Sequence, residues 1–232
     1  MDTLTHFRLC PFSRSVRLVL TELEFDVRLM EAQPWALGPE FMAMNPAGSL
    51  PVLRLDDGLT LYGAYAISEY LAEEVPSHPV DQLSVPLFPG DREARAEVRR
   101  LVDWFHRKTF DEATTHILEE KLYKRFRSGH GQPPDVGVMR AVHKNLNYTL
   151  GFIDYLAQER RWLAGDDLSF ADLAAAGQLS CADYLGEVDW SGYASTKLWY
   201  ARLKSRPAMR AILAERMPGA ARPPPYYDDP DF

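Results

Sequence analysis

The sequence is poor in cysteine, in long apolar runs and in positive charge, and each shortage argues against a class of protein. Only two cysteines occur among 232 residues, Cys10 and Cys181, so we expect no disulfide framework and a reducing compartment. No apolar run approaches the roughly 20 residues that cross a bilayer, so we expect no membrane insertion. The formal net charge of −7 argues against nonspecific nucleic-acid binding, which needs an excess of Lys and Arg.

The sequence also lacks the patterns of a metal centre and of a secretory leader. Its six histidines are scattered, and neither CxxC nor HExxH occurs, so we expect no metal site. The opening MDTLTHFRLC has none of the charged, apolar and small-residue regions of a secretory signal. We therefore expect a cytoplasmic protein. Because 46% of its residues are hydrophobic and 25% are charged, it can bury a substantial core and stay in solution.

The first third of the chain has the alternating pattern of an α/β domain. Runs with period two predict strands, and apolar stripes with helical spacing predict helices. The turn Asp57-Gly58 is a strong hairpin signal. The predicted elements are, in order, a strand over 3–9, a helix over 13–23, a strand over 25–31, an irregular segment, a hairpin over 50–63 and a helix over 64–74.

The remainder of the chain has a helical pattern after a proline-rich stretch. Residues 91–127 are long enough for one extended helix, or for two with a kink, and 136–159 predict another helix. Ser169 and Asp172 form a Ser-x-x-Asp capping box at the start of the next helix. Two shorter helices are predicted over 195–205 and 207–217, before a proline-rich end.

Three motifs, in this order, resemble the cytosolic glutathione transferases. CPFSRSVRLVL (10–20) is similar to their first turn and helix, NPAGSLPVL (45–53) to their cis-proline loop, and LSFADLAAA (168–176) to their C-domain capping box. The resemblance implies an α/β thioredoxin-like N-terminal domain followed by an all-α C-terminal domain, usually in a homodimer. On this division the domains are a thioredoxin-like domain over 1–75, a linker over 76–90, a helical domain over 91–216 and an acidic, aromatic tail over 217–232.

Several segments are also similar to a narrower family of alphaproteobacterial division proteins with this fold. They are NPAGSLPVL, EVRRLVDWF, EKLYKRF, RRWLAGDDLSFADLAAA and PPPYYDDPDF. Members of that family bind FtsZ, the bacterial tubulin-like filament protein. The resemblance therefore implies FtsZ as a partner and the division site as a location.

The turn CPFS offers two candidate catalytic groups, Cys10 and Ser13. A helix N-terminus stabilises a thiolate through free backbone N–H groups and the positive end of the helix dipole. A serine hydroxyl in that place can instead donate to a bound thiolate. The structural alternatives are that Ser13 caps a helix beginning at Arg14 and that Cys10 is a small buried apolar residue. The motif alone leaves these alternatives open.

The implied glutathione cleft lacks one of its three parts. The resemblance implies that Pro51 is cis and that Leu50 offers its backbone N–H and C=O to an extended glutathione. It also implies an acid-Ser pair for the γ-glutamyl group, but Gly63 and Ala64 stand there. Losing two charge-assisted hydrogen bonds, at about 1.5–3 kcal/mol each, weakens binding roughly 100-fold or more. We therefore expect no cofactor, with glutathione as the open alternative.

Candidate partner contacts lie outside this cleft. The EKLYKRFR segment is either a solvated helix end or a surface for an acidic partner. Trp35 is either a local core plug or an exposed anchor over the cleft. The tail has too few apolar residues to form a core, so it is a flexible end, a peptide-like ligand, or a segment that docks back through Phe232. The predicted contacts are Trp35, Lys121, Lys124, Arg125, Tyr227, Asp228, Asp229 and Phe232.

The sequence thus predicts a non-catalytic, dimeric adaptor that binds FtsZ filaments and regulates cell division. A dimer with two binding sites for one polymer gains apparent affinity through effective concentration. The alternative is a divergent glutathione or thiol transferase that uses Cys10 or Ser13. A third interpretation is a stress or chaperone-like protein with another partner. The Gly63-Ala64 pair separates the first two hypotheses.

Overall fold

The computed structural model describes residues 1–74, 86–129 and 132–232, and its N-terminal part is built on a mixed sheet. The elements of this part are β1 (Thr3–His6), α1 (Pro11–Glu22), β2 (Arg28–Glu31), α2 (Pro39–Met44), β3 (Val52–Arg54), β4 (Thr60–Tyr62) and α3 (Ala64–Glu74). The strand order is β2-β1-β3-β4, with β1 parallel to β2 and antiparallel to β3. Strands β3 and β4 pair antiparallel, so the predicted hairpin is confirmed.

The other part is mainly helical and begins with one long run in which π-helical turns alternate with α-helical ones. The run consists of α4 (Arg92–Asp103), η2 (Trp104–Thr114), α5 (Thr115–Leu118), η3 (Glu119–Tyr123) and α6 (Lys124–Ser128). It ends at Gly129, whose φ of +67° suits glycine because no Cβ is present. The further helices are α7 (Val136–Glu159), α8 (Phe170–Tyr184), α9 (Ala194–Lys204) and α10 (Pro207–Leu213). Residues 92–128 thus form one extended helical run, the first of the two predicted alternatives.

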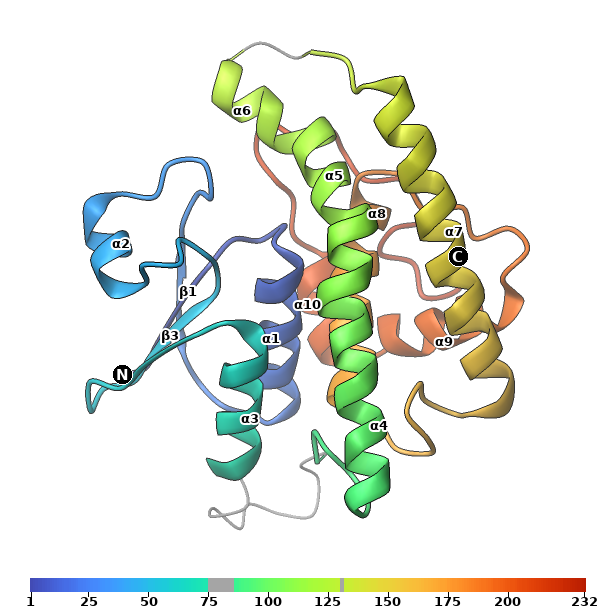
Figure 1. Cartoon of the computed structure of the whole chain (residues 1–232), viewed down its shortest axis with the longest axis horizontal. Coiled ribbons are helices and arrows are strands. Elements are labelled where there is room, and N and C mark those ends of the chain that lie inside the picture. Colours follow the sequence, from blue (N-terminus) through green and yellow to red (C-terminus); the bar gives the residue numbers. More distant parts are fainter. Residues whose placement is uncertain (75–85, 130–131) are drawn as a thin grey trace.

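Helix α1 lies between the sheet and the helical part, as Figure 1 shows, and most of its residues are buried. It packs closely against α8. A Cβ on Gly177 of α8 would lie only 2.5 Å from the carbonyl oxygen of Pro11 and 3.1 Å from the backbone nitrogen of Ser15. Glycine at position 177 therefore allows the two helices to approach, and this contact joins the two parts of the molecule.

The predicted capping box at the start of α8 is confirmed. The Asp172 carboxylate accepts hydrogen bonds from the Ser169 N–H at 3.1 Å, the Leu163 N–H at 2.8 Å and the Trp199 indole N–H at 2.9 Å. Asp172 is fully buried, and burial raises the pKa of its carboxyl group. The same carboxylate therefore caps one helix and fixes its contact with α9.

The segment before the cis-proline loop and the start of α1 differ from the sequence prediction. Helix α2 forms inside the segment expected to be irregular, with Gly38 as N-cap and Pro39 in its first turn. Helix α1 begins at Pro11, and its N-cap is Cys10, so the alternative that Ser13 caps a helix starting at Arg14 is wrong. Within the predicted linker 76–90, residues up to 85 lie outside the described residues, and residues 86–90 form neither helix nor strand.

The C-terminal tail is packed onto the helical part, contrary to the expectation that it lies outside the core. The Tyr227 side chain is fully buried, and Phe232 packs against Trp190 with ring centroids 5.0 Å apart. Arg14 and the Ser180 carbonyl satisfy the Tyr227 hydroxyl group, so its burial leaves no polar atom unpaired. The prediction of Tyr227 as a surface contact for a partner is therefore wrong, and the alternative in which Phe232 docks back is confirmed.

Candidate functional site

The turn before α1 and the cis-proline loop meet as the sequence predicts. The Leu50–Pro51 peptide bond is cis. The Cys10 thiol lies 3.7 Å from the Leu50 carbonyl oxygen, and its sulfur accepts a hydrogen bond from the Ser13 N–H at 3.5 Å. The structure thus brings Cys10, Ser13, Leu50 and Pro51 together at the N-terminus of α1.

Neither candidate nucleophile faces solvent. Cys10 is only 7% exposed, and burial raises the pKa of its thiol, although hydrogen bonds from Ser13 oppose the shift. Ser13 is fully buried, and its hydroxyl oxygen accepts a hydrogen bond from the Phe7 N–H at 3.3 Å. A buried thiol with a raised pKa and an engaged hydroxyl both disfavour thiolate chemistry.

Aromatic side chains of η2 close over the turn, and the sequence analysis did not identify them. The Phe12 ring lies 5.1 Å from the His106 ring and 4.6 Å from the Phe110 ring, measured between centroids. Burial lowers the pKa of His106 to about 3, so its imidazole is neutral at ordinary pH. The spacing of His106 and Phe110, four residues apart on a helical pattern, was the available signal for a shared face.

The corner at residues 63 and 64 lacks the acid-Ser pair, and its backbone conformation also disfavours side chains of this kind. Gly63 has a φ of +88°, a conformation in which an L side chain is strained by roughly 1–2 kcal/mol. Its N–H donates a hydrogen bond to the Pro51 carbonyl at 3.3 Å. Ala64 is 4% exposed and offers no hydroxyl group. This corner therefore lacks both side-chain ligands for a γ-glutamyl group, and the backbone donor at Gly63 is already used.

A small cavity of about 310 Å³ adjoins the start of α3, and the sequence analysis did not identify it. Two arginines in its wall are paired, Arg99 with Glu69 at 2.8 Å and Arg107 with Asp103 at 2.7 Å. Its wall combines these paired charges with the apolar side chain of Val102 and the rings of Tyr65 and His106. The lining residues are Tyr65, Arg99, Val102, Asp103, His106 and Arg107.

Trp35 joins the N-terminal part to the EKLYKRF segment. Its indole stacks on the Phe126 ring with centroids 4.7 Å apart and planes 10° apart, and lies 5.7 Å from the Tyr123 ring. On its other side it meets Phe7 edge-on at 5.3 Å. Trp35 is half-buried, so it is both a packing residue and a surface residue. We call Trp35, Tyr123 and Phe126 the aromatic face.

The cations of the EKLYKRFR segment differ in whether they form ion pairs with other residues. Lys121 forms an ion pair with Glu187 and donates to the Leu185 carbonyl at 3.1 Å, and burial lowers the pKa of its ammonium group. Lys124 pairs with Glu120 at 2.5 Å. Arg125 is exposed and forms no ion pair with any residue that the structure describes. Arg125 is therefore the predicted contact that is most available to a partner.

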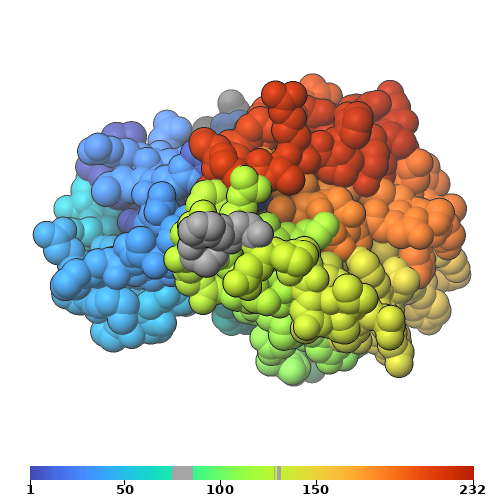
Figure 2. All heavy atoms as spheres, turned by 90° about the horizontal axis from the view of Figure 1, so that it is seen from above, coloured from blue at the N-terminus to red at the C-terminus, as the bar shows by residue number. Residues whose placement is uncertain are grey.

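The tail begins beside the aromatic face and ends on α9. A Cβ on Gly219 would lie 3.2 Å from the Phe126 ring, so the chain passes directly over that ring. Asp228 pairs with Arg216 at 2.7 Å, which lowers the pKa of its carboxyl group, and the Asp229 side chain is exposed. Figure 2 shows the tail, in red, lying against both the blue N-terminal part and the yellow-green region of α6.

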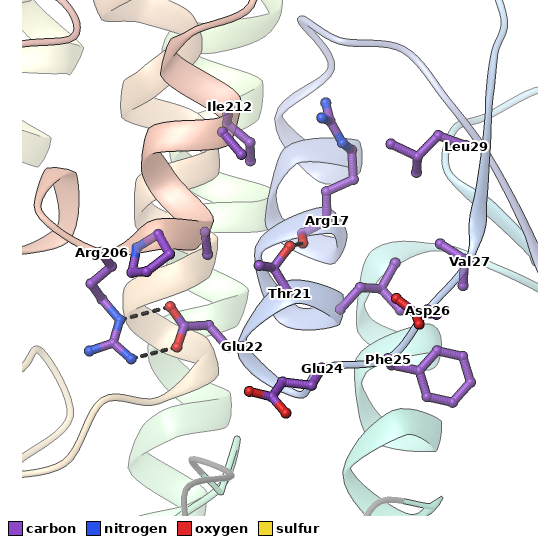
Figure 3. A pocket seen from close by; sticks show the side chains of 14 residues that line it. Arg17, Thr21, Glu22, Glu24, Phe25, Asp26, Val27, Leu29, Arg206 and Ile212 are labelled. Atoms are coloured by element: carbon purple, nitrogen blue, oxygen red, sulfur yellow. Dashed lines mark hydrogen bonds and ion pairs between the residues drawn. The ribbon is translucent and has the colours of Figure 1, made fainter.

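A wider groove of about 880 Å³ runs across α1 between α10 and the region of β2 (Figure 3). Its floor and walls carry both apolar and charged side chains. Arg206 and Glu22 form a bidentate ion pair at its edge, with nitrogen–oxygen distances of 2.5 and 2.7 Å. This pair ties α10 to the end of α1, so the groove marks the junction of the two parts of the molecule.

The structure contains no group of three or more His, Cys, Asp or Glu side chains placed to hold a metal ion within residues 1–74, 86–129 and 132–232. In the same ranges, no helix is both long and apolar enough to traverse a bilayer.

Comparison with known proteins gives matches over the whole chain. Residues 4–79 match the glutathione S-transferase N-terminal domain, and residues 136–207 match the glutathione S-transferase C-terminal domain. A protein of Caulobacter vibrioides called FtsZ-localized protein A is 43% identical over 99% of this chain and 98% of its own length.

Solved structures agree with these matches. A glutathione S-transferase from Rhodospirillum rubrum superposes with a TM-score of 0.92 at 44% identity, over 100% of both chains. FzlA from C. crescentus superposes with a TM-score of 0.91 at 41% identity, over 100% of this chain and 99% of that one.

Proposed function

The chain belongs to the glutathione S-transferase family, and from that premise we propose that it acts as a non-catalytic adaptor of FtsZ filaments at the division site. The observation that carries the proposal is the full-length similarity to a relative called FtsZ-localized protein A. The aromatic face supplies a surface for such a partner. Aromatic residues and arginine are enriched at protein interfaces, and the neighbouring Arg125, which is exposed and forms no ion pair with a described residue, suits an acidic partner segment.

The state of the thiol turn supports an adaptor without chemistry. A catalytic thiol needs a depressed pKa and access, whereas Cys10 is buried with a raised pKa. The Ser13 hydroxyl is held by the Phe7 N–H, and Gly63 and Ala64 lack the side chains that hold glutathione. We expect the turn to be retained for its contact with α8, and we expect no bound glutathione.

We further propose that the adaptor is a homodimer. Tyr62 and Tyr65 are 48% and 42% exposed at the end of β4 and the start of α3, and Tyr148 is 62% exposed on α7. Exposed aromatic residues of this size suit an interface between copies. A dimer presents two aromatic faces, and binding the second to the same filament is helped by effective concentration. Analytical ultracentrifugation tests this, because a monomer at micromolar concentration would contradict it.

Cosedimentation with polymerised FtsZ tests the proposed function, with single substitutions in the full chain. Arg125→Glu reverses an exposed charge next to the aromatic face, and we expect binding to fall by about 10-fold or more. Arg140→Glu is the matched control, since Arg140 is exposed on α7 and forms no ion pair with a described residue. Equal loss in both variants would indicate a nonspecific charge effect, and no loss in either would contradict the assignment of the face.

The alternative, a divergent glutathione or thiol transferase using Cys10 or Ser13, is tested by calorimetric titration with glutathione. The adaptor proposal expects no heat of binding at micromolar glutathione. Micromolar affinity that is lost in the Cys10→Ala or the Ser13→Ala variant would favour the transferase instead.

A further inference from the structure

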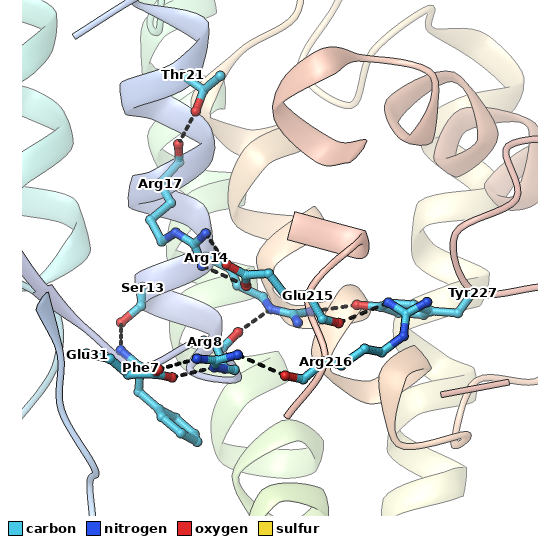
Figure 4. Close-up of polar contacts among 10 residues, drawn as sticks. All are labelled: Phe7, Arg8, Ser13, Arg14, Arg17, Thr21, Glu31, Glu215, Arg216 and Tyr227. Carbon is cyan, nitrogen blue, oxygen red and sulfur yellow. Dashed lines mark hydrogen bonds and ion pairs between the residues drawn. The ribbon is translucent and has the colours of Figure 1, made fainter. Parts of the chain in front are cut away.

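We propose that residues 215–232 form a strap whose docking is coupled to the first turn of α1 through a buried Arg14–Tyr227 contact. This segment follows α10 and crosses from α1 to α8 and α9 (Figure 4). We call it the strap. The inference concerns a conformational device in the fold and does not depend on the identity of any partner.

Arg14 is a fully buried cation that has no carboxylate partner among the described residues. Its Nε donates to the Arg8 carbonyl at 2.7 Å, and one terminal nitrogen donates to the Tyr227 hydroxyl at 2.8 Å. The other terminal nitrogen has no hydrogen-bond partner within the described ranges. The Tyr227 hydroxyl in turn donates to the Ser180 carbonyl at 3.2 Å. Among the described residues, a phenol of the strap is therefore one of two hydrogen-bond acceptors for a buried guanidinium group of α1, which also lies 5.9 Å from the centroid of the Tyr184 ring.

A second anchor holds the end of the strap on α9. Lys204 is 1% exposed, and its ammonium group donates to the carbonyl oxygens of Tyr226 and Asp229, both at 3.0 Å. The same nitrogen lies 3.5 Å from the centroid of the Phe232 ring and 5.5 Å from that of Tyr200. At such distances a cation is attracted electrostatically to the face of an aromatic ring. Helix α9 thus binds the backbone and the last side chain of the strap.

The beginning of the strap is tied to the N-terminal part by charge. Glu215 pairs with Arg17 of α1 through nitrogen–oxygen distances of 2.5 and 3.0 Å. The Arg216 carbonyl accepts a hydrogen bond from Arg8 at 2.8 Å. The strap therefore contacts both the turn and α1 on one side and the helical part on the other.

The coupling follows from the cost of leaving a buried charge unpaired. When the strap leaves, Arg14 keeps the Arg8 carbonyl and the Tyr184 ring but loses the Tyr227 hydroxyl, and removing one hydrogen-bond partner of a buried charged group is strongly unfavourable. The first turn of α1 must then open toward water or rearrange, because Arg14 lies four residues after Cys10 and its N–H bonds the Cys10 carbonyl. By linkage, a ligand that binds the turn changes the equilibrium constant for strap docking. A ligand that binds the strap changes the conformational equilibrium of the turn by the same factor.

Hydrogen-exchange mass spectrometry on full-length variants tests this coupling. Tyr227→Phe removes one hydroxyl group and keeps the ring, so we expect exchange in 10–16 and in 217–232 to accelerate together by about 10-fold or more. Tyr155→Phe is the matched control, since Tyr155 is 66% exposed on α7, and it should leave both segments unchanged. In the double variant Arg14→Met/Tyr227→Phe the charge is gone, and exchange in 10–16 should return toward the wild-type rate.

Two results would overturn the inference. In one, Tyr227→Phe accelerates exchange in 217–232 while 10–16 keeps its wild-type rate, which means that the strap docks without coupling. In the other, both segments accelerate only as much as α8 does, which means that the whole molecule unfolds and the strap is not a separate unit.

Discussion

Replacing Asp183 with asparagine should stabilise the protein at neutral pH, because its carboxylate is buried against the strap. Asp183 is fully buried near the end of α8, where one oxygen accepts a hydrogen bond from the Trp190 indole N–H at 3.0 Å. Burial raises the pKa of this carboxyl group from 3.8 to about 6, while the bond from Trp190 and the charge of Lys204 oppose the shift. The fold therefore favours the protonated form.

The sign and size follow from linkage. A folded-state pKa above the unfolded value means that stability is lost as pH rises from about 4 through 6, since the unfolded chain then releases its proton more readily. A shift from 3.8 to about 6 corresponds to about 3 kcal/mol at 1.36 kcal/mol per pKa unit. Asp183→Asn removes this penalty and keeps an oxygen for Trp190. The free energy of unfolding should rise by up to about 3 kcal/mol at pH 8 and be unchanged at pH 4.

Urea unfolding followed by circular dichroism between pH 4 and pH 8 measures this difference. Asp189→Asn is the control, because Asp189 is exposed and hydrogen bonds from Ser191 lower the pKa of its carboxyl group. The control should give no gain at pH 8. A difference between wild type and Asp183→Asn that does not vary with pH, or a loss of stability at pH 8, would refute the reasoning.

Three further predictions use the same unfolding assay or a simple thiol assay. His6 is 5% exposed, and burial lowers its pKa to about 4. The free energy of unfolding should therefore fall by up to about 3 kcal/mol as the pH drops from 6.5 toward 4. The variant His6→Leu should lack this part of the fall. If the free energy of unfolding of His6→Leu depended on pH as that of the wild type does, this prediction would be wrong. Gly177→Ala places a methyl group 2.5 Å from the Pro11 carbonyl and should destabilise by about 1–3 kcal/mol, whereas Gly151→Ala on α7, where the nearest atom is in the Tyr193 ring at 3.7 Å, should not destabilise. Cys10 and Cys181 are both buried, and burial raises the pKa of both thiols. A thiol reagent should therefore label the native protein no faster than the protein unfolds. Fast labelling of Cys10 at pH 7 would indicate an accessible site.

The elements that the sequence predicted well depend on local chemistry. The hairpin follows from Asp57-Gly58, and the start of α8 follows from Ser169 and Asp172, which lie three residues apart. The short helix at Pro39 also has a local signal, Gly-Pro-Glu, because proline suits the first turn of a helix and an acid suits its N-terminal end.

The parts that the sequence did not predict depend on contacts between distant segments. Tyr227 is buried because Arg14, 213 positions earlier, needs its hydroxyl group. The number of apolar residues in the tail gives no information about a hydrogen-bond partner so far away in the sequence. Likewise, CPFS indicates a thiol turn, but the burial of Cys10 depends on distant residues such as Leu50, whose carbonyl oxygen lies 3.7 Å from the thiol.

In the proposed function the aromatic face binds the partner and the thiol turn does not. Cosedimentation of full-length Trp35→Ala and Cys10→Ala with polymerised FtsZ separates these two surfaces, after both variants are confirmed to be folded. We expect Trp35→Ala to weaken binding by about 10-fold or more and Cys10→Ala to bind like the wild type. Unimpaired binding by Trp35→Ala together with a loss in Cys10→Ala would contradict this assignment.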